Sequence, residues 1–119
     1  MPILYLSPST QEWNPYITGT GSEEYYMNLV ADAMIPYLKA NTIAYKRNTP
    51  DMTAASSIRD SNAGYYDFHL ALHSNAAPES SAGQARGIIG FYYPTSTKGK
   101  RGQSYCANNC GKFIPCPAR

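Results

Sequence analysis

Short apolar runs that end in turn residues divide the chain into segments of strand length. Residues 3–6, Ile-Leu-Tyr-Leu, form the first run and stop at a Ser-Pro pair. Residues 42–45 and 66–72 are β-prone in the same way, and polar residues follow each of them. Residues 87–93 form a fourth apolar and aromatic run that a proline ends. The pattern therefore predicts four strands.

Helical spacing of apolar residues marks the stretches between the first three runs. Residues 22–40 begin with Ser22, a good N-cap, and Glu23 and Glu24 follow in the first turn, where negative charge favours the helix dipole. The residues of its apolar face recur three or four positions apart: Tyr26, Leu29, Val30, Ala33, Met34, Tyr37 and Leu38. Residues 53–64 predict a second, shorter helix.

The order of these elements is that of an α/β protein. We expect a mainly parallel or mixed sheet covered by helices, because strands alternate with helices along the chain. Residues 103–112 predict one more short helix, after a polar and basic stretch at 95–102. A chain of 119 residues is long enough for one hydrophobic core, so we expect a single domain over residues 1–119.

Composition and charge restrict the classes of partner. Hydrophobic residues make up 43% of the chain and charged residues 15%, which indicates a globular protein and not a disordered one. The net charge of +2 is too small to indicate a nucleic-acid partner, and Lys98, Lys100 and Arg101 are typical of a solvated turn. No stretch approaches the length of a membrane span, and no export signal precedes residue 3. We expect synthesis in the cytoplasm without a signal peptide.

Three cysteines lie in the last fourteen residues: Cys106, Cys110 and Cys116. An odd number cannot pair fully within the chain, so a disulfide scaffold is not expected. Their spacing lacks the close pairs of structural zinc modules, and no base that would activate a cysteine nucleophile is identifiable. Inert thiols are the favoured interpretation.

His73 is the first candidate for chemistry. It lies at the carboxyl end of the predicted strand 66–72, where α/β proteins place functional loops, and its ring can bind a metal or transfer a proton near neutral pH. Glu23 or Glu24 could join it as a metal ligand, although both glutamates could equally serve the helix dipole alone. His69 shares a strand face with His73 but sits among apolar neighbours, so we expect a buried histidine outside the site.

These residues belong to a longer pattern along most of the chain. It comprises Gly21, Glu24, Asn28, Leu29, Arg47, Ile58, Arg59, Asn62 and Ala63, then Tyr66, Asp67 and the run 70–76, and finally Gly87 before Phe91-Tyr92-Tyr93. In order and spacing it resembles the zinc-dependent N-acetylmuramoyl-L-alanine amidases of the amidase-3 type. The resemblance covers about residues 3–109, and a match in several parts is more specific than one motif.

The resemblance implies a mixed α/β sheet with helices on both sides and one zinc ion. The zinc-activated water would hydrolyse the amide between N-acetylmuramic acid and L-alanine in peptidoglycan. Glu24 and His73 correspond to two of the three zinc ligands. Arg59, Asn62 and Asn75 correspond to positions that would frame the site, by orienting loops or touching the substrate.

Two departures from the family pattern affect the site. The family's first ligand is a histidine in a Gly-His-Gly loop after the first strand, where this chain has Thr10. Glu12 could supply a carboxylate there if the loop is shifted, and Gln11 could supply a weaker oxygen ligand; right-handed crossovers would bring this loop near His73. The family's catalytic glutamate lies beyond residue 119, so the domain is expected to be truncated or diverged and its catalytic residue is unassigned.

Two alternatives to the amidase remain at this point. A catalytically impaired module of the same fold would bind peptidoglycan without cleaving it. A basic surface protein would use the residues from Lys98 to Arg101 and exposed tyrosines to bind a partner.

Overall fold

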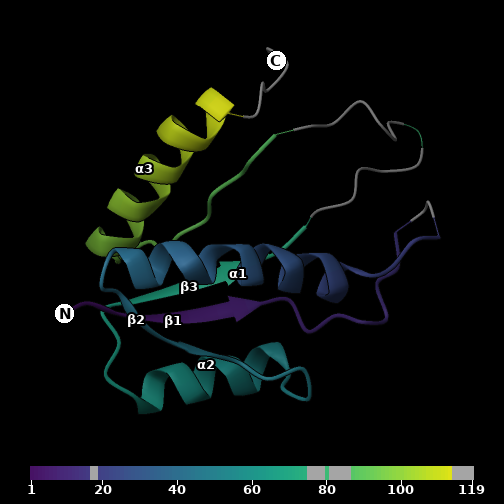
Figure 1. Ribbon diagram of the computed structural model, residues 1–119, viewed down its shortest axis with the longest axis horizontal. Coiled ribbons are helices and arrows are strands. Elements are labelled where there is room, and N and C mark those ends of the chain that lie inside the picture. The colour runs from purple at the N-terminus through teal and green to yellow at the C-terminus, as the bar shows by residue number, and fades with distance from the viewer. Residues whose placement is uncertain (17–18, 75–79, 81–86, 114–119) are drawn as a thin grey trace. The chain divides into compact units, whose positions relative to one another are not determined.

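The computed structural model of the chain describes residues 1–16, 19–74, 80 and 87–113, with the backbone alone for 110–113. The chain divides into two compact units, Met1–Ser74 and Asn75–Arg119. In the part of the chain described, the first unit holds a three-stranded sheet with two helices and the second holds one helix (Figure 1). The architecture is α/β, as the sequence predicts.

The sheet is parallel throughout, with the strand order β2-β1-β3. Its strands are β1 (Ile3–Pro8), β2 (Ala44–Arg47) and β3 (Phe68–Leu72). In the register of the sheet, Leu6 of β1 pairs with Arg47, the last residue of β2, and Pro8 at the end of β1 pairs with Leu72, the last residue of β3. The carboxyl ends of the strands therefore meet at one edge, which is where the loops of an α/β sheet bind ligands.

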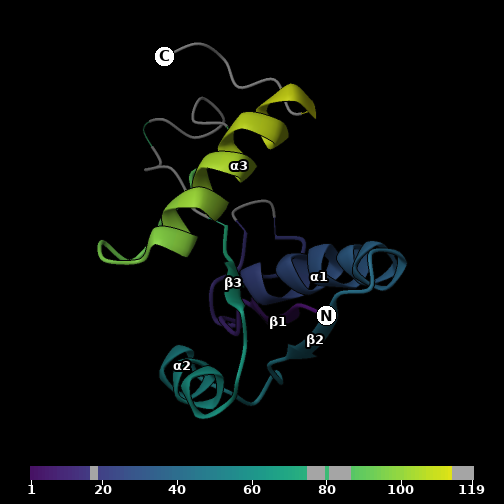
Figure 2. The same ribbon diagram turned by 90° about the vertical axis from the view of Figure 1, so that its left-hand side faces the viewer.

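Helices α1 (Glu23–Ala40) and α2 (Ala54–Ala63) lie on opposite faces of the sheet (Figures 1 and 2). Side chains of a strand alternate between the two faces, so β1 serves both helices. Leu4 and Leu6 pack with Ala31 and Leu38 of α1, while the Tyr5 hydroxyl donates to Asp60 of α2 at 2.8 Å. None of the helices within the described part of the chain is long and apolar enough to cross a membrane.

The starts of both helices follow from their caps. The Ser22 hydroxyl accepts the backbone N–H of Tyr25 at 3.2 Å, and Thr53 and Ser56 form a reciprocal capping box at the start of α2. Each bond satisfies a backbone donor that the first helical turn leaves without a partner. The predicted starts of these helices, and the end of α2 before Gly64, are confirmed.

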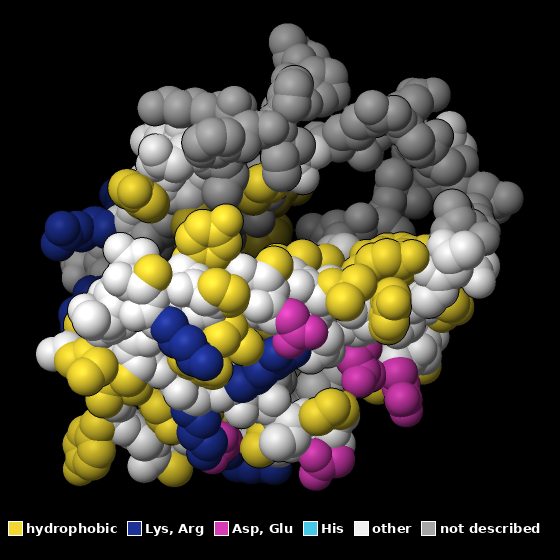
Figure 3. Space-filling model, viewed as in Figure 1, with side chains coloured by type: hydrophobic (Ala, Val, Ile, Leu, Met, Phe, Trp, Pro, Cys, Tyr) yellow, Lys and Arg dark blue, Asp and Glu magenta, His cyan; other side chains and the backbone are white. Residues whose placement is uncertain are grey.

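The face of α1 that packs on the sheet agrees with the predicted one only in part, since Met34 and Leu38 pack on the core as predicted and other members do not. Ala31 is fully buried at its centre, whereas Leu29, Val30 and Tyr37 of the predicted face are exposed by 46%, 43% and 74%. A small side chain lets the helix backbone come close to the strands, and this contact sets which residues point inward. Apolar side chains consequently remain on the outer surface of α1 (Figure 3).

Near the end of the chain one predicted element is wrong and another is confirmed with an earlier start. Residues 87–93 form no strand, and Ile89, Phe91 and Tyr93 are more than half exposed. A segment forms a strand only if it can hydrogen-bond to the edge of a neighbouring strand, and a β-prone composition does not ensure that such an edge is available. Helix α3 (Thr97–Phe113) begins six residues before its predicted start, because Ser96 caps it: its hydroxyl accepts the Gly99 N–H at 2.9 Å. The predicted turn at Lys98, Lys100 and Arg101 is therefore wrong, since these residues lie in α3.

The second strand begins two residues later than predicted because Thr42 has a left-handed backbone, with φ of +54°. This conformation is costly for any residue with a Cβ. We expect Thr42→Gly to raise the free energy of unfolding by roughly 0.5–1 kcal/mol, since glycine adopts this φ freely at some cost in chain entropy. Urea unfolding measures the change. Thr42→Ala keeps the Cβ, and an equal gain in that variant would show that backbone strain is not the cause.

Candidate functional site

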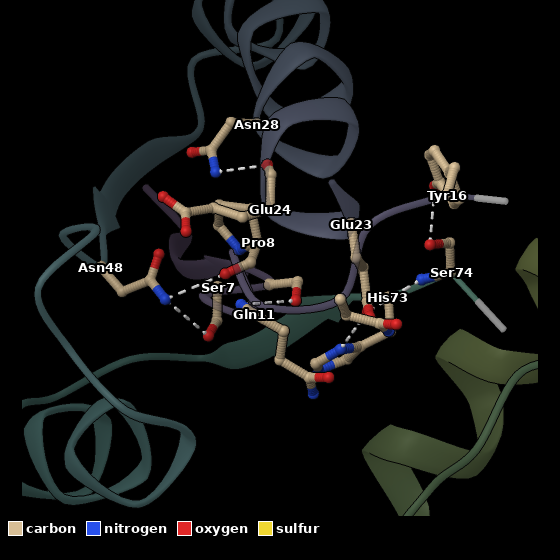
Figure 4. Close-up of polar contacts among 12 residues, drawn as sticks. Ser7, Pro8, Gln11, Tyr16, Glu23, Glu24, Asn28, Asn48, His73 and Ser74 are labelled. Atoms are coloured by element: carbon tan, nitrogen blue, oxygen red, sulfur yellow. Dashed lines mark hydrogen bonds and ion pairs between the residues drawn. The ribbon is translucent and has the colours of Figure 1, made fainter. Parts of the chain in front are cut away.

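The carboxyl edge of the sheet brings together segments that are distant in sequence. The loop after β1, Asn48 after β2, His73 after β3 and the first turn of α1 all lie there (Figure 4). A hydrogen bond of 2.9 Å from the Ser9 N–H to the Leu72 carbonyl ties the first loop to the end of β3.

The central contact at this edge joins Glu23 to His73. The carboxylate oxygen Oε1 of Glu23 lies 2.9 Å from Nδ1 of His73 and also accepts the Ser74 N–H at 3.1 Å. Its second oxygen, Oε2, accepts an N–H of the Asn14 side chain at 2.9 Å. The Glu23 side chain is only 4% exposed and the His73 side chain 46% exposed, so a fixed, buried carboxylate meets an accessible imidazole (Figure 4).

The surroundings of Glu23 keep it ionised. Burial by itself would raise the pKa of its carboxyl, but hydrogen bonds from Asn14, His73 and the Ser74 N–H outweigh burial and lower the pKa below its ordinary value. An ionised carboxylate only accepts hydrogen bonds, so the proton between the two side chains belongs to Nδ1 of His73. Glu23 can therefore bind a cation without first losing a proton.

This pKa shift predicts an acid-sensitive fold. A carboxyl with a lowered folded-state pKa contributes to stability above its unfolded-state pKa of about 4.3, and the contribution is lost as pH falls through the folded-state pKa. We expect the difference in unfolding free energy between the parent and Glu23→Gln to shrink as pH falls from about 6 to 3. Other carboxyls are common to both proteins and cancel. A difference that stays constant with pH would contradict the assignment.

The loop that precedes α1 places Glu23. It folds back on itself, with hydrogen bonds from the Tyr16 N–H to the Gly21 carbonyl and from the Glu23 N–H to the Asn14 carbonyl, both of 3.0 Å. Gly21 has a φ of +91°, and a Cβ there would lie 3.0–3.1 Å from the rings of the two following tyrosines, Tyr25 and Tyr26. Only glycine meets both demands without strain.

Asn48 holds the strand ends and α2 together. Its side-chain amide nitrogen lies 3.3 Å from the Ser7 hydroxyl, 3.1 Å from the Pro8 carbonyl and 3.1 Å from the Ser57 hydroxyl. Its backbone N–H donates to the Leu6 carbonyl at 3.1 Å. A buried amide at this point therefore fixes β1, β2 and α2 relative to one another.

A pocket of about 140 Å³ opens beside His73, between the sheet and α2. Its apolar lining consists of Pro8, Trp13, Ala54, Ile58 and Ala71. Hydroxyl, amide and imidazole groups line the rest: Ser7, Ser9, Thr10, Gln11, Asn48, Ser57, His69 and His73. None of these lining residues is a lysine, arginine, aspartate or glutamate. Burial lowers the pKa of His69, so its ring is neutral at pH 7.

The predicted site residues fall in different places. Glu24 follows Glu23 in the helix, and the Glu24 side chain points away from His73 (Figure 4). Among the described residues, the Oε2 atom of Glu24 is buried and has no hydrogen-bond partner. Gln11 lines the same pocket as His73, whereas Glu12 is exposed and does not line it. The structure therefore does not bring together His73, Glu24 and Glu12.

The remaining predicted residues add no ligand to the pair. Arg59 and Asn62 are exposed on α2 and do not line the pocket, and Asn75 lies outside the described residues. Cys106 is exposed on α3, Cys116 lies outside the described part, and of Cys110 only the backbone is described. The cysteine interpretation stays a prediction.

The pair fits part of a zinc site. Among the residues that the structure describes, no group of three His, Cys, Asp or Glu side chains could hold a metal ion. Zinc binds imidazole nitrogen and carboxylate oxygen at about 2.0–2.2 Å, and two ligands of one ion lie close together. The contact of 2.9 Å between Glu23 and His73 is compatible with a shared ion after a small shift. The Gln11 side chain points toward His73 and lines the same pocket, so its amide oxygen is a candidate third ligand (Figure 4).

Sequence reasoning did not select three residues of this site. It kept Glu23 only as an alternative to Glu24, because a one-residue step on a helix turns a side chain by about 100° and the pattern does not fix which one faces the sheet edge. Asn14 and Asn48 do not belong to any recognisable sequence motif. Their only signal is that they are short polar residues beside a helix start and a strand end.

Comparison of the chain with models of protein families, with curated proteins and with solved structures finds no match.

Proposed function

We propose that this chain is a metal-dependent amidase domain that acts on peptidoglycan, at the amide between N-acetylmuramic acid and L-alanine. The observation that carries the proposal is the 2.9 Å contact between His73 Nδ1 and the buried carboxylate of Glu23 at the carboxyl edge of the sheet. The α/β architecture with a helix on each face of the sheet supports the proposal, although the three described strands are all parallel and the resemblance implies a mixed sheet.

His73 and Glu23 would hold the metal, with the Gln11 amide oxygen as a third, weaker ligand. An ion would take the place of the proton that Nδ1 now shares with the carboxylate. A bound zinc ion supplies a water of lowered pKa and polarises the amide carbonyl. One imidazole, one carboxylate and one amide make a harder ligand set than imidazoles alone, so the site should also accept manganese.

The other residues of the edge orient this pair. Asn14 and the Ser74 N–H fix the two carboxylate oxygens of Glu23, which is the role of hydrogen-bonding groups behind metal ligands. The Tyr16 hydroxyl donates to the Ser74 hydroxyl at 2.7 Å and so braces the turn after β3. The pocket beside His73 would receive the substrate next to the scissile amide.

A peptidoglycan-binding module without hydrolysis is the second candidate. The observation that favours it is the pocket lining, which contains no aspartate or glutamate among the described residues. A general base has to lie within hydrogen-bond reach of the attacking water. Such a module would bind the same substrate and release nothing.

Release of stem peptide from purified peptidoglycan tests the proposal. We expect release by the zinc-loaded chain, loss of release with a chelator, and its return when zinc is added back. His73→Ala should release nothing while it keeps its fold, because the His73 side chain is largely accessible. Zinc binding and peptidoglycan binding without release would support the second candidate. A chain that binds neither would contradict both.

A further inference from the structure

The charged residues of the chain are divided unequally between its two compact units. Every aspartate and glutamate except Glu79 lies in residues 1–74, whereas the sequence of residues 87–113 contains no acidic residue and several basic ones: Lys98, Lys100, Arg101 and Lys112. Charge asymmetry between two parts of a chain is typical of a part that binds a polyanion or an anionic membrane. Among the described residues, the side chains of Lys98, Lys100 and Arg101 form no ion pair, so their charge is available to a partner.

Exposed apolar side chains form a row along residues 87–93. The most exposed ones occupy every second position: Ile89 at 59%, Phe91 at 82% and Tyr93 at 76%. Tyr92, between two of them, faces α3, because a Cβ on Gly99 of that helix would lie 3.2 Å from the Tyr92 Cβ. Successive side chains of an extended chain point to opposite sides, so these three side chains, called here the apolar row, point away from α3.

Helix α3 holds basic residues close to the apolar row. Residues 87–93 pack directly on the helix, because a Cβ on Gly90 would lie only 2.5 Å from the Gln103 Cγ. Lys98, Arg101 and Tyr105 are all exposed, and their spacing of three and four residues places them on one face of α3. The unit therefore presents cations and apolar side chains to solvent within a short stretch of chain.

We propose that residues 87–105 bind the surface of an anionic lipid bilayer, with the apolar row among the acyl chains and the α3 cations at the lipid phosphates. Apolar side chains gain free energy by leaving water, and lysines and arginines beside them are attracted to anionic headgroups. Their long side chains let the charges stay at the headgroups while neighbouring apolar groups enter the bilayer. A nucleic acid would also neutralise the cations, but it offers no hydrocarbon phase to Ile89. The inference does not depend on the proposed function.

Co-sedimentation of the full chain with lipid vesicles tests this proposal. The vesicles contain either phosphatidylcholine alone or phosphatidylcholine mixed with phosphatidylglycerol, and a chelator is present throughout. We expect binding to the anionic vesicles to be at least about tenfold tighter than binding to the neutral ones. High salt should reduce this preference, because it screens exposed charges.

A pair of charge variants locates the cationic part of the surface. Lys98→Gln combined with Arg101→Gln should weaken binding to the anionic vesicles at least about tenfold. Lys39→Gln combined with Arg59→Gln removes the same charge from exposed positions of α1 and α2, and should bind within about twofold of the parent. Thermal unfolding checks that both proteins fold.

A pair of tyrosine variants tests insertion of the apolar row. Tyr93 and Tyr37 are almost equally exposed, by 76% and 74%, but Tyr37 lies on α1. Tyr93→Ser should weaken binding to the anionic vesicles by roughly fivefold, whereas Tyr37→Ser should leave it unchanged.

The outcomes separate this inference from the metal proposal, because the chelator makes vesicle binding independent of zinc. Failure to bind the anionic vesicles would overturn the inference, and so would equal binding to both kinds of vesicle. Equal weakening by the two members of either pair of variants would overturn it as well. Displacement of the chain from the vesicles by a single-stranded oligonucleotide, with Tyr93→Ser binding as the parent does, would assign the surface to a polyanion and contradict lipid insertion.

Discussion

Glu23→Gln is expected to weaken zinc binding by a factor of at least about 100, whereas Glu24→Gln should leave it within a few fold of the parent. The two glutamates are neighbours in the first turn of α1, but only Glu23 contacts His73. Glutamine keeps the size of the side chain and can still contact Asn14, so the loss would come from the missing charge. Competition with a fluorescent zinc chelator measures both affinities.

The pair of variants is its own control, because each removes one negative charge from the same helix turn. A larger effect of Glu24→Gln would assign the ligand to the position that the amidase-3 resemblance implies, and it would contradict the contact seen at Glu23. Equal effects would indicate only the general attraction of a cation to negative charge near the helix start.

Asn48→Ala is expected to lower the free energy of unfolding by roughly 2–3 kcal/mol. The substitution removes a buried amide that contacts Ser7, Pro8 and Ser57, and it leaves hydrogen-bonding groups of β1 and α2 without their partner. Since a small domain is stable by only about 5–15 kcal/mol, this is a large fraction of the total. Urea unfolding in the absence of zinc measures it.

Asn41→Ala is the matched control for this prediction. Asn41 also donates a side-chain hydrogen bond, to the Tyr37 carbonyl at 2.8 Å, but it is exposed at the end of α1. Water can replace that bond, so we expect a loss below about 1 kcal/mol. Equal losses in the two variants would show that Asn48 does not join the strand ends to α2.

The helices were predictable wherever local chemistry decides them. Ser22 and Thr53 are caps that act within one turn, and the described helices α1 and α2 begin directly after them. Residues 87–93 show the opposite case, because their β-prone composition says nothing about whether a strand edge is available to pair with them. The start of the second strand shows a third case. Thr42 has a left-handed φ because of the way α1 ends, and the β-prone composition of residues 42–45 does not reveal this.

The sequence predicts where the candidate site lies in the fold, but it does not predict which of the site's residues contact one another. His73 follows from the polar residues at the end of an apolar strand, and the parallel sheet brings it to the edge where such sites form. Which glutamate meets it depends on the rotation of α1, and that rotation is set by the packing of Ala31 against the sheet. The Asn48 contacts depend in turn on three segments that come together only in the folded chain.

Crystals of the zinc-loaded chain, measured at the zinc absorption edge, test the central claim most directly. The account predicts an anomalous peak within about 2.0–2.2 Å of both His73 Nδ1 and a Glu23 carboxylate oxygen. A peak at Glu24 or at the cysteines of α3, or no peak at the carboxyl edge of the sheet, would contradict it.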